Sequence, residues 1–161
     1  MIAGLVIVGL SLNAAGFTRV SPCDLAGHDL GGAGGGATTE ASAEPCETRC
    51  AARSGCEAFV YISGWRRCFL KGPGTKVVSV RFYAGVIRDG KIADAGFDQD
   101  FSGKDLRRVE HVASGELCAK ECEAEPGCKA FAYIGGYADC WLKKDVGNRR
   151  EKVFSCGIKS H

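Results

Sequence analysis

Ten cysteines dominate the chemistry that this sequence could support, among 161 residues with only three histidines and one methionine. Eight of them repeat the spacing C-x3-C-x5-C-x11-C, first at Cys46, Cys50, Cys56 and Cys68 and again at Cys118, Cys122, Cys128 and Cys140. This is not a usual structural-zinc spacing, and no histidine recurs with it. Disulfide exchange would favour a C-x-x-C pair, which the sequence lacks. The cysteines therefore predict structural disulfides, formed in an oxidising compartment.

Other groups that could do chemistry are scattered. His28 and His111 are not at equivalent positions, and His161 is the last residue. Asp98 and Asp100 could bind a cation, but two carboxylates are a weak signal. The glycines at 32–36 are not followed by the Lys of a phosphate-binding loop. We therefore expect no enzymatic activity, no cofactor and no metal site.

A repeat of period 72 organises the chain. Residues 46–71 and 118–143 are identical at 13 of 26 positions. Such self-similarity indicates two copies of one structural unit. We place module 1 at 21–88 and module 2 at 95–160, joined by the polar turn sequence Arg88-Asp89-Gly90-Lys91. The Gly/Ala/Thr-rich segment 31–44 is expected to be a loop in module 1.

The same elements are expected in each module. A short extended segment precedes a helix that starts near Ser42 or Ser114, each a good N-cap. The runs AFVYI and AFAYI alternate large and small residues, which predicts a half-buried strand. Further strands carry Cys68 or Cys140 and the segments 77–86 and 152–158. The prediction is an α+β fold of two modules, each a helix packed on a small antiparallel sheet.

Four cysteines per module allow three disulfide pairings, and sequence alone does not choose among them. Helix geometry favours one, because cysteines four residues apart lie on the same helix face. The second helix cysteine can reach the cysteine in the short loop beyond the helix end. The first helix cysteine can then pair with the cysteine on the following strand. The favoured pairs are Cys46 with Cys68, Cys50 with Cys56, Cys118 with Cys140 and Cys122 with Cys128.

The N-terminus carries an uncharged apolar run from Ile2 to Leu12, followed by small residues. Its length is typical of a signal-peptide core and too short to span a bilayer. We predict a signal peptide over 1–16 and a secreted or periplasmic protein without a stable membrane span. The alternative is a buried strand or helix of the domain. A net charge of +2 argues against a strongly basic nucleic-acid-binding protein.

The run C-x3-C-x5-C-x-A-F-x-Y, followed by C-[FW]-L-K, resembles the PAN/apple family, and the copy at 118–144 resembles its short bacterial-type members. The lead-in DQDFSGKDL also resembles that family's first strand and turn. The resemblance covers both modules. It implies a helix cradled by an antiparallel sheet, the two core disulfides favoured above, and a non-catalytic extracellular module that binds proteins or carbohydrates.

Many members of this family have a third disulfide between their first and last strands. Here Cys23 has Ala84 as its last-strand counterpart, and Cys156 has Gln99 as its first-strand counterpart. Each module thus keeps one half of the bond. We predict that Cys23 bonds Cys156 within one chain, so that the modules form a closed pair, with the terminal strands exchanged as one option. The alternative to this monomer is a covalent dimer through either cysteine.

Candidate ligand-binding residues lie near the Cys68 and Cys140 strands. Trp65 and Tyr137 are equivalent residues at Gly-flanked hairpin tips, where an exposed ring could stack on a sugar or anchor a protein. Basic residues also cluster there, around the Cys68 strand at Arg66, Arg67 and Lys71, and after Trp141 at Lys143, Lys144, Arg149 and Arg150. These cations could bind an anionic polysaccharide, or they could be solvated loop residues.

The predicted function is a non-catalytic extracellular binding or adhesion module that recognises carbohydrate or protein. The alternative is a structural or regulatory accessory that binds an extracellular enzyme or envelope protein.

Overall fold

A computed structural model describes residues 16–31 and 36–160. Residues 1–15, nearly all of the expected signal peptide, lie outside the described residues. The helices are α1 (Ala43–Ala52) and α2 (Gly115–Ala124), and a 3-10 turn, η1, covers Ser63–Trp65. None of the helices in this part of the chain has the length and apolar character needed to cross a membrane.

The strands of the described residues form two five-stranded antiparallel sheets and two small ribbons. Sheet 1 has the order β1 (Phe17–Val20), β14 (Phe154–Lys159), β4 (Ala58–Ile62), β5 (Arg67–Lys71), β3 (Thr38–Thr39). Sheet 2 has the order β8 (Lys91–Phe97), β7 (Arg81–Arg88), β11 (Ala130–Gly135), β12 (Asp139–Lys143), β10 (Asp105–Val109). The ribbons pair β2 (Asp24–Ala26) with β6 (Lys76–Val78), and β9 (Gln99–Phe101) with β13 (Arg149–Glu151).

Each helix packs on one face of its sheet through its cysteines. Ser42 and Ser114 are the N-cap residues, as expected, and the Ser114 hydroxyl accepts a hydrogen bond from the Leu117 amide at 3.3 Å. One disulfide joins each helix to a strand, β5 or β12, and a second joins it to the loop that follows the helix. The pairs in the structure are Cys46–Cys68, Cys50–Cys56, Cys118–Cys140 and Cys122–Cys128. The α+β prediction of two disulfide-stapled modules is confirmed.

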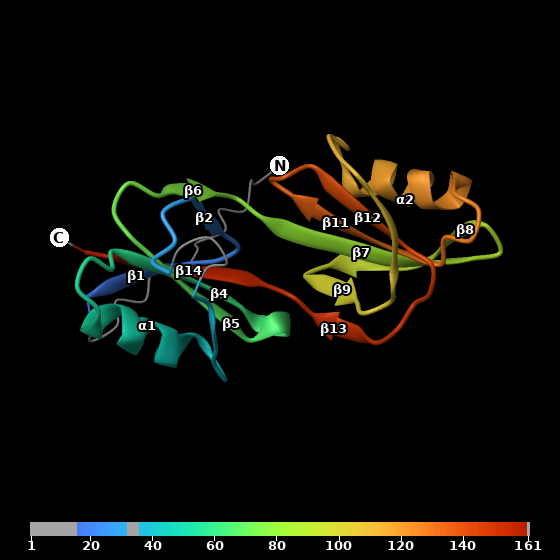
Figure 1. Cartoon of the computed structure of the whole chain (residues 1–161). Helices are drawn as coiled ribbons and strands as arrows, with labels where there is room; N and C mark the ends of the chain where they lie inside the picture. Colours follow the sequence, from blue (N-terminus) through green and yellow to red (C-terminus); the bar gives the residue numbers. More distant parts are fainter. Residues whose placement is uncertain (1–15, 32–35, 161) are drawn as a thin grey trace, which may run out of the picture.

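The last strand of each module belongs to the sheet of the other. Strand β7, from module 1, pairs with β11 of module 2 and with β8, which begins in the linker. Strand β14, from module 2, pairs with β4 of module 1 and with β1, which precedes that module. Figure 1 shows β7 (light green) in the lobe that contains α2 and β14 (red) in the lobe that contains α1. The two modules are therefore interlocked by strand exchange.

A disulfide and a hydrogen bond occupy equivalent places in the two lobes. Cys23 is bonded to Cys156 within the chain, with Cα atoms 6.0 Å apart. The equivalent positions in the other lobe hold Gln99, in the ribbon strand β9, and Ala84, in β7 of sheet 2, and the Gln99 amide donates to the Ala84 carbonyl at 3.1 Å. The two cysteines that lack a partner within their own modules thus bond to each other at sheet 1, because β14 takes the place there that β7 would have had.

The exchanged segments cross where two equivalent residues meet. Phe82 and Phe154, which are equivalent residues, stack on each other with ring centroids 5.4 Å apart and planes 11° apart. Beside them, a Cβ at Gly64 would collide with the carbonyl oxygen of Glu151. A glycine at the hairpin tip therefore lets the crossing segment pass close to the sheet.

The chain between the modules is a β-hairpin. Strands β7 and β8 are joined by Asp89 and Gly90, which have φ values of 51° and 72°. Two residues with positive φ match the twist of a tight hairpin, for which Asp-Gly is a preferred sequence. The polar turn expected at 88–91 thus directs module 1's last strand into sheet 2.

Two details of the strand predictions are wrong. Strand β4 is buried at all five positions, because Val60 and Ile62 pack on a second apolar cluster with Phe154 on the face away from the helix. The segment 77–86 is not one strand but ends β6 and begins β7, with a break at Ser79 and Val80 where the chain crosses between the sheets.

Candidate functional site

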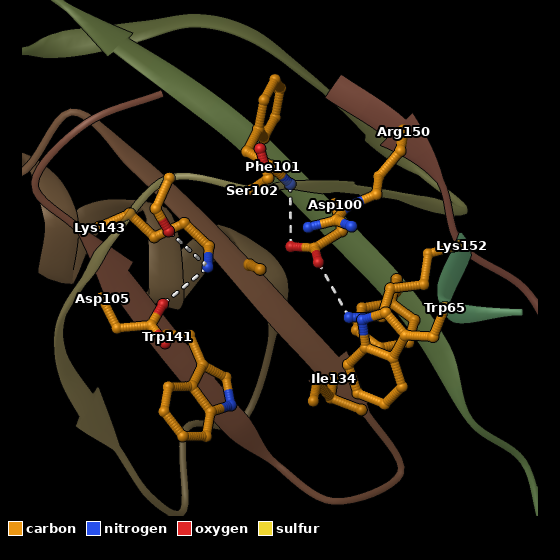
Figure 2. A pocket seen from close by; sticks show the side chains of 13 residues that line it. Trp65, Asp100, Phe101, Ser102, Asp105, Ile134, Trp141, Lys143, Arg150 and Lys152 are labelled. Atoms are coloured by element: carbon orange, nitrogen blue, oxygen red, sulfur yellow. Dashed lines mark hydrogen bonds and ion pairs between the residues drawn. The ribbon is translucent and has the colours of Figure 1, made fainter. Parts of the chain in front are cut away.

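Two pockets adjoin each other where the exchanged modules meet. The larger, here called the Trp65 pocket, has a volume of about 440 Å³. The second, the Tyr137 pocket, has a volume of about 410 Å³ and shares Trp65 and Ile134 with the first. Figure 2 shows the Trp65 pocket with its lining side chains. Pockets of this size hold small molecules or parts of larger chains.

The two pockets are built from equivalent residues. Each has an aromatic residue from the hairpin of one module and a wall from the sheet and ribbon of the other. Trp65, which follows β4 of sheet 1, lies against the pocket in sheet 2. Tyr137, which follows β11 of sheet 2, lies against the pocket in sheet 1. The wall residues match as Asp100 with Asp24, Asp105 with Asp29, Lys143 with Lys71, and Trp141 with Phe69.

A buried lysine paired with a carboxylate lies on the same wall of both pockets. Lys143 Nζ is 2.7 Å from Asp105 Oδ1, and Lys71 Nζ is 2.7 Å from Asp29 Oδ1. Both lysines are buried. Lys143, expected as a ligand-binding cation, lies in the pocket wall on β12, where Asp105 neutralises it.

A second ion pair lies on the opposite side of the Trp65 pocket. Lys152 Nζ is 2.9 Å from Asp100 Oδ2, and both residues are buried (Figure 2). The ammonium also lies 3.5 Å from the centroid of the Trp65 ring and 4.3 Å from that of Phe82. Contact with aromatic faces favours a cation, so Lys152 fixes the position of Trp65 at the pocket.

The surroundings of Lys152 lower its pKa from 10.5 to about 8. Burial is the main cause, because it disfavours the charged form. The ion pair with Asp100 opposes this shift, whereas the neighbouring charges of Arg150 and Lys143 add to it. Lys152 is therefore charged in the folded protein below pH 8.

In the Tyr137 pocket the equivalent carboxylate has a different partner. The Tyr137 hydroxyl donates to Asp24 Oδ2 at 2.5 Å, and Val80 replaces the lysine. Burial raises the pKa of Tyr137, and the bond to Asp24 raises it further. Tyr137 thus stays a protonated donor, and this hydrogen bond holds module 2's hairpin against module 1's ribbon.

The structure brings some of the expected site residues together and leaves others apart. Trp65, Tyr137 and Lys143 all line the pockets, and the two aromatic residues are 44% and 42% exposed. Arg66, Arg67 and Lys144 line neither pocket. Sequence reasoning missed the most buried pair at the site, Asp100 with Lys152. Asp100 is a candidate cation ligand from the sequence together with Asp98 and falls at the same place as Asp24 in the repeat, whereas Lys152 has no sequence signal as a site residue.

The arrangement is suited to binding. Asp98, a candidate cation ligand from the sequence together with Asp100, is paired with Arg81 at 2.9 Å. Within residues 16–31 and 36–160, no cluster of three His, Cys, Asp or Glu side chains could hold a metal ion. What the pockets offer is aromatic surface next to carboxylates, lysines and a hydroxyl.

Comparison with known families gives two matches along the chain. Residues 23–86 match a PAN domain, and residues 99–143 match a second PAN domain. No curated protein matches the chain.

Proposed function

The chain belongs to the PAN domain family as a tandem pair, and we propose from this that it is a non-catalytic, extracellular carbohydrate-binding protein whose binding sites are the two pockets between the modules. PAN domains generally bind proteins or carbohydrates, and the matches include no catalytic domain. Five disulfides fit an oxidising compartment outside the cytosol.

The observation that carries this proposal is the composition of the two pockets. A sugar ring has an apolar face of C–H groups and a rim of hydroxyls that both donate and accept hydrogen bonds. Trp65 and Trp141 supply flat apolar surface in one pocket, and Asp100 and Asp105 supply acceptors beside it. A concave, mostly apolar site with a few fixed polar groups is typical of small-ligand recognition.

Saccharide binding by aromatic variants tests the proposal. Binding to an oligosaccharide array should be lost or strongly reduced in Trp65→Ala together with Tyr137→Ala. Phe97→Ala is the matched control, because Phe97 is also exposed, at 56%, but lines neither of these two pockets. An array that wild type does not bind, or binding that survives both pocket substitutions, contradicts the proposal.

A protein partner is the second candidate. Strand β8 is an outer strand of sheet 2 and exposes Ile92 and Phe97. Exposed apolar residues on an edge strand are suited to contact with another chain. Capture of one defined extracellular enzyme or envelope protein, lost in Phe97→Ala but retained in the pocket variants, would favour an accessory function.

A further inference from the structure

The two pockets differ in charge at equivalent positions. The Trp65 pocket is lined by three cations, Lys143, Arg150 and Lys152, and by the two carboxylates of Asp100 and Asp105. The Tyr137 pocket is lined by one cation, Lys71, and by the two carboxylates of Asp24 and Asp29. One pocket therefore has an excess positive charge and the other an excess negative charge.

Arg150 carries the excess positive charge of the Trp65 pocket. Lys143 and Lys152 are each paired with a carboxylate of the wall. Arg150 is exposed, and in the part of the chain that the structure describes no hydrogen bond or ion pair holds its guanidinium. Its backbone lies opposite Asp100 in the β9–β13 ribbon, and Figure 2 shows its side chain reaching over the pocket beside Asp100.

The Tyr137 pocket lacks a counterpart to this cation. The residues equivalent to Arg150 and Lys152 are Val78 and Val80, and both pack in the apolar cluster behind that pocket. The difference lies in the crossing segments, 78–80 and 150–152, which give each pocket its charge. The repeat has thus kept the shape of the site and changed its electrostatics.

We infer that the Trp65 pocket takes a sugar bearing one carboxylate, a uronic acid, with Arg150 as its ionic partner, and that the Tyr137 pocket takes a neutral sugar. This inference rests on the proposed carbohydrate binding. A guanidinium presents a planar fork of donors that matches a carboxylate with two parallel hydrogen bonds. Asp100 and Asp105 then accept sugar hydroxyls and oppose ligands with several negative charges.

Titrations with an oligouronate and its methyl ester test this assignment, because the ester has the same sugar ring without the charge. Trp65 lines both pockets, whereas Trp141 lines only the Trp65 pocket, so the indole N–H signal of Trp141 in a ¹⁵N–¹H correlation spectrum reports binding there. Wild type should bind the acid at least about tenfold more tightly than the ester, as expected for a hydrogen bond between charged groups. Arg150→Gln should remove this preference while keeping affinity for the ester.

Arg149→Gln is the matched control, since Arg149 is the adjacent arginine, pairs with Asp94 at 2.9 Å and lies outside the Trp65 pocket. It should keep the full preference for the acid. Equal affinity of wild type for acid and ester, or an unchanged preference in Arg150→Gln, overturns the inference. Tighter binding of a sulfated oligosaccharide than of the oligouronate overturns the assignment to carboxylate. If neither acid nor ester binds, the proposed function itself fails.

Discussion

Removing the Cys23–Cys156 bond should destabilise the protein more than removing a bond within one module. The bond joins residues 133 positions apart, and both sulfurs are fully buried. Because Cys46–Cys68 and Cys118–Cys140 already shorten the path, the bond closes about 90 residues of free chain in the unfolded state. Loop-closure entropy then predicts a loss of about 4–5 kcal/mol in Cys23→Ala with Cys156→Ala.

The Cys50–Cys56 bond provides the comparison. Its cysteines are six positions apart, so the same relation gives a loss of only about 2 kcal/mol for Cys50→Ala with Cys56→Ala. Urea unfolding of both oxidised double variants, followed by circular dichroism and tryptophan fluorescence, measures the two losses on one scale. A smaller loss for the long-range pair than for the local pair would refute the reasoning that this bond locks the exchanged strands.

Three further predictions concern the crossing region. The pKa of Lys152 is lowered to about 8, so the unfolded chain binds more protons between pH 8 and 10.5. The free energy of unfolding of wild type, measured in urea, should therefore rise with pH across this window relative to Lys152→Met; parallel curves would contradict the shift. Gly64→Ala would press its Cβ against the Glu151 carbonyl and should cost about 1–3 kcal/mol, seen as a lower melting temperature; unchanged melting would argue against this close approach. Ala84→Cys with Gln99→Cys should form a sixth disulfide, because these positions match Cys156 and Cys23, and a mass spectrum with two free thiols would contradict the equivalence.

The sequence was sufficient to predict what local spacing determines. Two cysteines four residues apart on a helix have few cysteine partners within reach, so the disulfide pairing followed from helix geometry. The two α+β modules followed from the repeat. The unmatched Cys23 and Cys156 also pointed to a closed pair of modules. Nothing local, however, tells which sheet receives a final strand. Strand β7 offers Gly85 to the core Phe131 of sheet 2, and its equivalent Gly157 lies against Phe59 of sheet 1, so each strand would fit either sheet.

The site was only partly predictable for the same reason. Trp65 and Tyr137 stood out because they are equivalent aromatic residues beside glycine. The pair of Asp100 with Lys152 lies 52 positions apart and depends on how the crossing segments meet. Lys143 was named as a cation near the Cys140 strand, but its burial and its pairing with Asp105 could not be read from the sequence.

The central claim is that saccharide binds in the pocket where the modules interlock, and the two tryptophan side chains provide the most direct test. Trp65 and Trp141 line the Trp65 pocket, and they are the two tryptophans of the chain. In a ¹⁵N–¹H correlation spectrum, titration with an oligouronate should shift both indole signals together and to saturation. Saturable shifts confined to Arg66, Arg67 and Lys144 or to strand β8, with both indole signals unmoved, would contradict it.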